Sequence, residues 1–356
     1  MHEPELTTRV LLRSRPVGMP ELSNFEIEQT SIPQPGPGKV LVRTIYLSLD
    51  PYMRGRISSN ELYETPVALG APILGGTVGQ VLESRSDRLA PGDLVLGMGG
   101  WQSHFVAEAG QLTVLDASRA PISTALGVLG VPGFTGFAGL REIGRPQPGE
   151  TVVVAAASGA VGTVVGRAAR AAGARVVGIA GGSEKVAYLS SFGFDAAIDH
   201  RSPTFAADLA AAVPDGIDVY FENVGGAVWE AVMPRLNPFA RIPVSGLVAH
   251  YNEDASPGGT DRLGQFMRTL QMKRWSIRGF VQSDFVDTQW AAFQREVAGW
   301  IADGTFDYRE DIVAGLQNAP QAFIGLLSGR NFGKLLVRVS PDPTLDTSCQ
   351  LGYCNK

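Results

Sequence analysis

The stretch Val152–Gly162 constrains the fold of this chain more than any other part of the sequence. It begins with a run of valines, and small residues follow, with glycines at 159 and 162. A short run of β-branched residues is typical of a central parallel strand. Such glycines at the start of a helix could serve a purely structural turn. Here a helix expected over 163–172 and a second apolar segment at 175–180 complete a βαβ unit, which favours dinucleotide binding. The residues predicted to cradle the pyrophosphate are Gly159, Ala160, Val161 and Gly162.

The end of the second strand indicates which dinucleotide the chain binds. Sites for NAD usually have an acidic residue there that holds the ribose 2′-hydroxyl. This chain instead reads Gly181-Gly182-Ser183-Glu184-Lys185, with no acid at the strand tip. Gly182 makes room, Ser183 can donate a hydrogen bond, and Lys185 brings positive charge toward a 2′-phosphate. Lys185 could also be an ordinary solvated helix residue, so the missing acid is the main reason to predict NADPH.

Composition excludes several classes of function. The chain has 356 residues, 44% hydrophobic and 18% charged, which is ordinary for a globular protein. A net charge of −5 gives no reason to expect nucleic-acid binding. No apolar stretch is long enough to span a membrane, and the first residues lack a signal-peptide core, so a cytoplasmic location is expected. The two cysteines, Cys349 and Cys354, leave the body of the chain without a disulfide framework or a cysteine nucleophile.

The pattern of elements predicts two domains. Residues 1–125 contain short strands broken by Gly and Pro, which is typical of a β-barrel-like domain. Residues 126–304 alternate strands and helices, which predicts a doubly wound parallel sheet. Residues 305–340 return to the first domain, and 341–356 form a loose tail. The strands of the sheet are expected near 151–156, 175–180, 195–199, 217–222, 239–246 and 275–281, with helices near 160–172, 184–192, 204–212, 226–235, 260–272 and 288–302.

Several motifs carry a resemblance to a known family. They are Leu49-Asp-Pro-Tyr-Met-Arg-Gly55, Ala156–Gly162, Glu184–Leu189, Asp218-Val-Tyr-Phe-Glu-Asn-Val-Gly-Gly226, Tyr251-Asn252 and Asn331-Phe-Gly-Lys334. The chain resembles the zinc-independent branch of the medium-chain dehydrogenase/reductase superfamily. That branch includes prostaglandin/leukotriene reductases, plant double-bond reductases and bacterial curcumin reductases. The resemblance implies a GroES-like β-barrel catalytic domain that closes on a Rossmann domain, a homodimer, and NADPH-dependent reduction of the double bond of α,β-unsaturated ketones or aldehydes.

The resemblance also implies further cofactor contacts. The implied residues are Thr135, Asn223, Ser245, Val248, Tyr251, Phe280, Val281, Gln282 and Asn331. His200 stands where mammalian relatives carry a tyrosine that faces the 2′-phosphate, so it belongs to the predicted set. This departure leaves open whether His200, Arg201 or neither contacts the phosphate.

The positions that hold zinc in metal-dependent relatives carry no suitable ligands. They read Leu47-Ser48-Leu49-Asp50 and Leu74-Gly75-Gly76-Thr77. A catalytic zinc needs about three protein ligands. The first domain has no cysteine, and His104 is its one internal histidine. We therefore expect no metal in the site.

Three tyrosines are candidates for the catalytic donor. In enone reduction, negative charge develops on the carbonyl oxygen, which calls for a hydrogen-bond donor. Tyr251 follows the fifth strand of the sheet, Tyr52 lies in the Asp-Pro-Tyr-Met-Arg motif, and Tyr63 lies in a loop where similar curcumin reductases carry a pocket tyrosine. Each could instead be a half-buried tyrosine with a satisfied hydroxyl, and the ribose 2′-hydroxyl of the cofactor could share the task.

Two questions stay open from the sequence. Residues 252–262 have the composition of a lid over the cleft or of a plain surface loop. The leading interpretation, an enone reductase, competes with an NADPH quinone oxidoreductase and with a non-catalytic NADPH-binding sensor, because a fold does not guarantee an activity.

Overall fold

The computed structural model describes residues 6–58, 65–253 and 262–345. The chain divides into two compact units: a first unit of Met1–Gly127 with Glu310–Lys356, and a second unit of Val128–Arg309. The divisions fall close to the expected boundaries at 125/126 and 304/305. Each unit has its own core.

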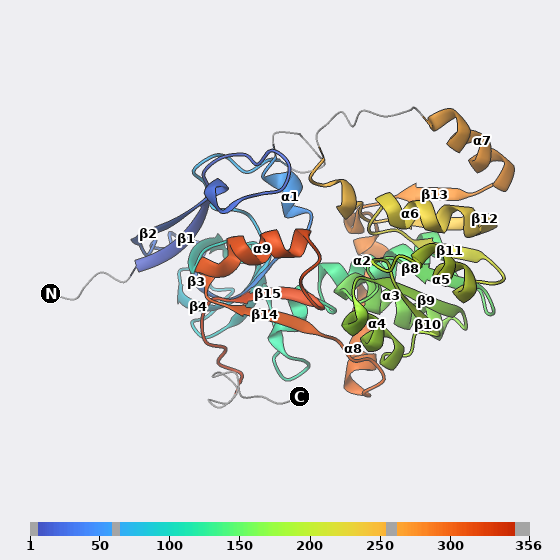
Figure 1. Cartoon of the computed structure of the whole chain (residues 1–356). Helices are drawn as coiled ribbons and strands as arrows, with labels where there is room; N and C mark the ends of the chain where they lie inside the picture. Colours follow the sequence, from blue (N-terminus) through green and yellow to red (C-terminus); the bar gives the residue numbers. More distant parts are fainter. Residues whose placement is uncertain (1–5, 59–64, 254–261, 346–356) are drawn as a thin grey trace. The chain divides into compact units, whose positions relative to one another are not determined.

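The second unit is built on a six-stranded parallel sheet (Figure 1). Its strands are β8 (Thr151–Val154), β9 (Arg175–Ala180), β10 (Ala196–Asp199), β11 (Ile217–Phe221), β12 (Leu236–Val244) and β13 (Ser276–Gly279). Their spatial order is β10-β9-β8-β11-β12-β13, so the chain starts in the middle of the sheet and reverses direction there. This is the strand order of a Rossmann sheet, and it confirms the predicted doubly wound parallel sheet.

Helices connect these strands and cover both faces of the sheet. They are α2 (Val131–Gly139), α3 (Ala160–Ala171), α4 (Ser183–Ser191), α5 (Phe205–Ala212), α6 (Gly226–Val232), α7 (Leu263–Lys273) and α8 (Val286–Ala302). Short turns of helix lie at Leu140–Gly144, Met233–Arg235, Val248–His250 and Gln282–Phe285. The helix α2 and the π-helical turn after it have no counterpart among the elements expected from the sequence.

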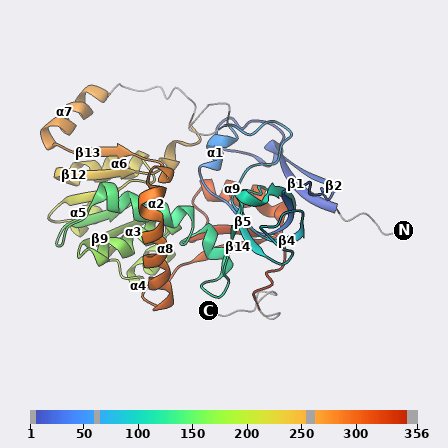
Figure 2. The same ribbon diagram turned by 180° about the vertical axis from the view of Figure 1, so that it is seen from behind.

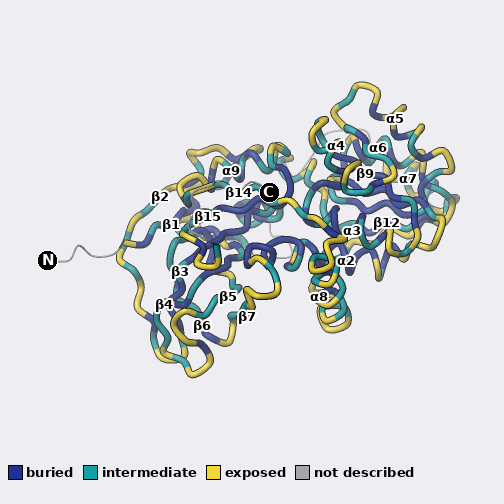
Figure 3. Tube along the Cα trace, turned by 90° about the horizontal axis from the view of Figure 1, so that it is seen from below, coloured by how far each residue is buried: buried dark blue, intermediate teal, exposed yellow. Residues whose placement is uncertain are grey.

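The alternation of side chains along β8 explains how both faces are filled. Val153 packs in one core with residues of α5 and α6, whereas Val152 and Val154 pack in another with residues of α3 and α4. Successive side chains of a strand point to opposite faces, so an unbroken apolar run identifies a strand that is buried on both. In Figure 2, α8 lies beside α2 and α3, with which it shares a third core. Figure 3 shows the middle of the second unit as buried and the outer turns of its helices as exposed.

The first unit is a seven-stranded mixed sheet with a separate hairpin. The hairpin pairs β1 (Leu6–Leu12) with β2 (Phe25–Ser31). The sheet contains β3 (Lys39–Ser48), β4 (Thr77–Ser84), β5 (Leu94–Gly97), β6 (His104–Glu108), β7 (Thr113–Val114), β14 (Glu310–Ala314) and β15 (Lys334–Arg338). The unit also holds α1 (Met53–Arg56), α9 (Ala319–Leu327) and short helical turns at Leu22–Asn24, Ala109–Gln111, Ile122–Leu126 and Leu316–Asn318. The returning strand β15 lies between β14 and β3.

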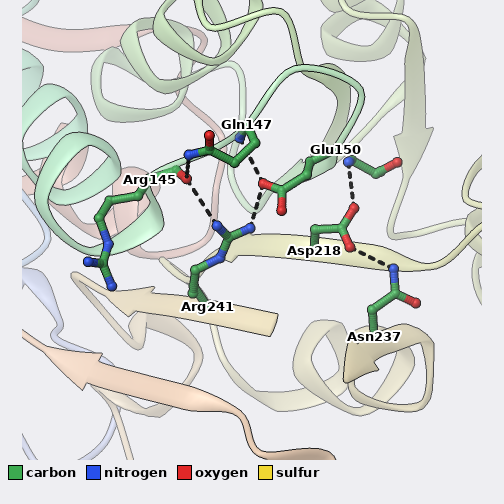
Figure 4. Close-up of polar contacts among 7 residues, drawn as sticks. Arg145, Gln147, Glu150, Asp218, Asn237 and Arg241 are labelled. Atoms are coloured by element: carbon green, nitrogen blue, oxygen red, sulfur yellow. Dashed lines mark hydrogen bonds and ion pairs between the residues drawn. The ribbon is translucent and has the colours of Figure 1, made fainter. Parts of the chain in front are cut away.

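A polar network fixes the amino-terminal edge of the parallel sheet (Figure 4). Arg241 donates to Glu150 at 2.5 Å and to the Arg145 carbonyl at 3.0 Å. Asp218 accepts the backbone N–H of Thr151 at 2.9 Å and the side chain of Asn237 at 2.8 Å. These bonds join the starts of β8 and β11 to β12, because each carboxylate bridges two segments that are distant in sequence.

Two expectations needed adjustment. The sequence predicts the last strand of the sheet near 275–281, but β13 has only four residues, all of them exposed. The sequence predicts the fifth helix from 260, whereas α7 begins at Leu263; residues 254–261 lie outside the described part. Within the described residues, no helix is both long and apolar enough to cross a membrane.

Candidate functional site

The glycine-rich turn after β8 forms the first part of the site. Gly162 has a packing role, because a Cβ there would lie 2.6 Å from the Ala157 Cα and 2.7 Å from the Ala156 carbonyl oxygen. The helix α3 can therefore start close against the turn only with glycine at this position. Gly159 is different, since its Cβ would meet nothing nearer than 3.5 Å. In this turn Ala156 has a left-handed backbone conformation, with φ of 50°. That conformation stores strain in the turn, because alanine disfavours it.

The turn aims the start of a twelve-residue helix at the carboxyl edge of the sheet. The first backbone N–H groups of a helix have no partner within it and carry partial positive charge. Here these groups belong to Ala160, Val161 and Gly162. Such a helix start is suited to an anionic pyrophosphate.

An aspartate at the end of β10 shapes the turn after β9. Asp199 Oδ1 accepts the backbone N–H groups of Gly182 and Arg201, both at 2.9 Å. These bonds lower the pKa of Asp199, that from Gly182 most. Glu184, the acid nearest in sequence, forms an exposed ion pair with Arg309 at 3.7 Å. Sequence reasoning missed the role of Asp199, although an acid directly after a predicted strand was a readable signal.

Three basic side chains gather at the tip of β9. A Cβ on Gly181 would lie 2.8 Å from both His200 Nε2 and Arg201 Nε, so both side chains lie against the Gly181 backbone. His200 keeps an exposed face, but desolvation against its neighbours lowers its pKa, and the positive charges of Arg201 and Lys185 lower it further. His200 and Arg201 thus both lie beside Gly181, and which of them contacts a 2′-phosphate stays a prediction.

The turn after β11 joins that after β12. Asn223 donates its side-chain N–H to the Ala155 carbonyl at 2.8 Å and accepts a hydrogen bond from the Ser245 hydroxyl. Val248 donates its backbone N–H to the Asn223 carbonyl at 3.3 Å. The ends of β8, β11 and β12 are therefore linked through Asn223.

Tyr251 is a half-buried residue directly after the turn Val248–His250. Burial raises the pKa of Tyr251, while a hydrogen bond with the Leu247 backbone lowers it. The hydroxyl lies 3.2 Å from where a Cβ on Gly246 would stand. The phenol is therefore protonated at neutral pH and folds back over the start of its own segment.

The other predicted cofactor residues of the second unit occupy the following places. Phe280 donates its backbone N–H to the Val244 carbonyl at 3.3 Å and packs against Gly139. Val281 and Gln282 begin the helical turn after β13. Thr135 lies in α2, where its hydroxyl donates to the Val131 carbonyl at 2.8 Å. Apart from Thr135, the predicted residues of this unit follow the carboxyl ends of all six strands.

Tyr52 and Asn331 belong to the first unit. Tyr52 precedes α1, and the guanidinium of Arg56 lies over its ring at 5.6 Å. Arg54 of the same motif is buried and donates to the Gly18 carbonyl at 2.8 Å, so it holds a neighbouring loop. Asn331 donates to the Gly333 carbonyl at 2.8 Å.

A cavity of about 670 Å³ opens in the first unit beside Arg56. Its walls are mostly apolar, with polar side chains from Arg56, Thr65 and Gln102. The lining residues are Arg56, Thr65, Pro66, Val67, Ala68, Ala71, Pro72, Leu74, Met98, Gly99, Gly100 and Gln102. A second cavity of about 360 Å³ lies in the second unit near Arg170 and Gly193, and none of the predicted cofactor residues lines it.

The positions corresponding to zinc ligands hold a different polar arrangement. The Lys334 ammonium, 5% exposed, donates to Asp50 Oδ1 at 2.6 Å and to the Leu49 carbonyl at 3.0 Å. Ser48 donates to the other oxygen of Asp50. Thr77 accepts the backbone N–H of Gly99 at 3.0 Å. No cluster of three or more metal-ligating side chains occurs in the described ranges.

Three predictions lie outside the described residues. Tyr63 falls in 59–64, most of the proposed lid falls in 254–261, and both cysteines fall in 346–356.

Comparison with known proteins places the chain in a family. A model described as the N-terminal domain of oxidoreductase matches residues 8–115, and one described as zinc-binding dehydrogenase matches 160–299. The NADPH-dependent curcumin reductase of Escherichia coli K12 is 49% identical and covers 94% of this chain and 97% of its own length. The chain belongs to the medium-chain dehydrogenase/reductase family. The predicted resemblance and the two-part fold are thereby confirmed.

Further comparisons support this family assignment. The NADP(+)-dependent 2-alkenal reductase of Nicotiana tabacum is 40% identical, covering 96% of this chain and 99% of its own. The solved structure of CurA from Vibrio vulnificus in complex with NADPH is 46% identical, with a TM-score of 0.91, and covers 94% of this chain and 100% of its own. A quinone oxidoreductase of Escherichia coli, at 19% identity and a TM-score of 0.72, shares the fold.

Proposed function

We propose that this protein reduces the carbon–carbon double bond of α,β-unsaturated ketones or aldehydes with NADPH. NADPH is the cofactor, as in the relatives whose names specify it. The residues at the carboxyl edge of the parallel sheet fit it. The start of α3 suits the pyrophosphate, and the basic cluster of Lys185, His200 and Arg201 suits a 2′-phosphate. This cluster at the tip of β9 is the observation that carries the proposal of an NADPH enzyme.

The chemistry proposed is a balanced two-electron reduction. Bound NADPH would supply a hydride to the β-carbon and be oxidised to NADP⁺, and a proton from water would add at the α-carbon and complete the single bond. Negative charge passes to the carbonyl oxygen in the transition state. Tyr251 is the donor proposed for that oxygen, because its phenol stays protonated and its oxygen is held against Leu247. The roles of Tyr52 and Tyr63 are proposed as contacts to the substrate.

The cavity beside Arg56 supports an apolar substrate. Pro66, Val67, Leu74 and Met98 provide hydrocarbon walls, and the volume of about 670 Å³ lies in the range of small-molecule pockets. An enone with an alkyl or aryl substituent fits such a surface, since its one strongly polar atom is the carbonyl oxygen.

The test is Tyr251→Phe, assayed by NADPH oxidation with a panel of enones and quinones. If the hydroxyl is the main donor, kcat should fall by about a hundredfold or more while KM changes little. A loss of about tenfold would mean that another donor shares the task. Tyr188→Phe, at another tyrosine of the same unit, is the matched control and should leave kcat unchanged.

Each outcome of the panel has a clear meaning. Turnover of enones with slow turnover of quinones supports the proposal. Quinones as the better substrates would make the protein a quinone oxidoreductase, and NADPH binding without turnover of any acceptor would make it a cofactor sensor. Wild-type kcat of Tyr251→Phe on every accepted enone would assign Tyr251 to packing.

A further inference from the structure

Glu222 is a buried carboxyl group that the proposed chemistry does not use. It follows the last residue of β11 and is 2% exposed, although glutamate is rarely buried to that degree. It stands directly before Asn223, at the carboxyl edge where the predicted cofactor residues gather. A buried acid in such a place requires a structural or functional reason.

One oxygen of Glu222 holds the turn that follows β11. Its Oε1 accepts the backbone N–H groups of Val224 at 2.6 Å and Gly225 at 2.9 Å, and the Tyr220 hydroxyl at 3.1 Å. The Glu222 backbone also pairs with β12, because its N–H donates to the Pro243 carbonyl at 2.9 Å. The side chain therefore fixes the shape of the turn from the inside of the protein.

The turn in its own right supports the segment that carries Tyr251. Ala249 donates its backbone N–H to the Val224 carbonyl at 2.9 Å. The Gly226 N–H donates to His250 Nε2 at 3.1 Å, and the other ring nitrogen of His250 lies 2.8 Å from Glu253. With Val248 bonded to Asn223, three successive residues before Tyr251 are attached to this turn. A displacement of the turn would consequently displace Tyr251.

The second oxygen of Glu222 takes no part in holding the turn. Oε2 is buried and has no hydrogen-bond partner among the described residues. Burial raises the pKa of Glu222, although hydrogen bonds from Val224, Gly225 and Tyr220 oppose the rise. Glutamine has nearly the same shape as glutamate and keeps an accepting oxygen for Val224, Gly225 and Tyr220.

We infer that Glu222 is a positioning residue for the reductase reaction, which holds Asn223 and Tyr251 in place through the turn between β11 and α6. This inference rests on the proposed function, because it assumes that Tyr251 acts at the substrate. In this role Glu222 accepts hydrogen bonds from the turn and transfers no proton.

The decisive comparison is Glu222→Gln against Glu222→Leu. The glutamine variant keeps an accepting oxygen and should stay within about fivefold of wild-type kcat, since a change in one hydrogen bond is worth about 1 kcal/mol, or about fivefold. The leucine variant keeps the bulk but removes the acceptor. It should lower kcat by about a hundredfold, as expected for a misplacement of about 1 Å at a reacting group. Val228→Ala, in the core under α6, is the control for lost stability and should retain wild-type kcat.

A double-mutant cycle shows whether Glu222 acts through Tyr251. If it does, the kcat of Glu222→Leu/Tyr251→Phe should be no lower than that of Tyr251→Phe alone. Multiplication of the two losses would overturn the inference, as would wild-type kcat in Glu222→Leu. The cycle is measured with the substrate that the wild type reduces fastest. The test of Glu222 therefore remains valid even if that substrate is a quinone and the proposed substrate class is wrong.

A second readout needs no turnover. Reduced nicotinamide fluoresces, and its emission reports the surroundings of the ring in the complex. Glu222→Gln should reproduce the wild-type emission of bound NADPH, whereas Glu222→Leu should change it while the Kd rises by less than about tenfold, because the contacts to the phosphates are intact. Identical emission from the wild type and Glu222→Leu would overturn the inference even in a protein without catalytic activity.

Discussion

The basic cluster at the tip of β9 predicts how the protein distinguishes NADPH from NADH. His200 and Arg201 lie against the Gly181 backbone, the charge of Lys185 reaches His200, and Asp199 accepts two backbone N–H groups of the same turns. We expect Lys185→Ala and Arg201→Ala each to weaken NADPH binding and to leave NADH binding nearly unchanged, because NADH lacks the 2′-phosphate.

The magnitude follows from the kind of contact. A hydrogen bond to a charged group contributes about 1.5–3 kcal/mol, which corresponds to about a ten- to hundredfold change in Kd. Both variants leave the start of α3 intact, so the weak binding that remains should resemble that of NADH. Lys185→Arg, which keeps the charge, is the matched control and should lose less than about fivefold.

His200 adds a pH dependence with a definite sign. In the cofactor-free protein its pKa is lowered by desolvation and by the charges of Arg201 and Lys185, so the ring is neutral at pH 7. A bound phosphate favours the charged ring and raises the pKa in the complex. Binding then takes up a proton, so NADPH affinity should increase as the pH falls from 8 toward 6, by at most about tenfold per pH unit.

The assay is a Kd titration of both cofactors between pH 6 and 8, for wild type and His200→Asn. The 2′-phosphate itself gains a proton near pH 6, which opposes the effect, so the variant should bind NADPH equally well or more weakly as the pH falls. NADH should show neither trend. The reasoning is refuted if wild type and His200→Asn share one pH profile, or if Lys185→Ala and Arg201→Ala weaken both cofactors alike.

Three further predictions concern the metal, the assembly and the stability of the second unit. Prolonged chelation should leave activity intact and metal analysis should find well under one zinc per chain, whereas a stoichiometric zinc needed for turnover would contradict this. Light scattering at micromolar concentration should give the mass of a homodimer, as proposed from the exposed edge strand β13; a monomer mass would refute it. Glu150→Gln weakens the bond to Arg241, whose side chain is 17% exposed, and should lower the free energy of unfolding by about 1.5 kcal/mol and Tm by about 3–6 °C. Glu184→Gln removes the exposed ion pair with Arg309 and should lower the free energy of unfolding by less than about 0.5 kcal/mol. Equal losses in Glu150→Gln and Glu184→Gln would contradict the role of the polar network at the amino-terminal edge of the sheet.

The parallel sheet could be predicted from the sequence because its strands are buried on both faces. Runs such as Val152–Val154 and Val176–Val177 have no polar residue to leave exposed. The predicted positions of the six strands agree with β8 to β13 to within a few residues. The edge strand β13 was predicted least well, since an exposed strand has no hydrophobic pattern that sets its ends.

The contacts that shape the site could not be predicted in the same way. Asp199 bonded to Gly182 and Glu222 bonded to Gly225 are side-chain to backbone contacts, whose partners depend on the path of a turn. The left-handed Ala156 is likewise invisible, because alanine gives no conformational signal as glycine does. What the sequence does show is an acid after an apolar strand, and both Asp199 and Glu222 fit that description.

The two edges of the sheet use acidic residues for different purposes. At the amino-terminal edge, Glu150 and Asp218 bind cationic and amide side chains and join neighbouring segments. At the carboxyl edge, Asp199 and Glu222 bind backbone N–H groups of the turns themselves. These acids at the carboxyl edge hold the turns that carry the proposed site residues. We therefore expect substitutions at the first edge to change Tm with little effect on kcat, and the reverse order of effects at the second.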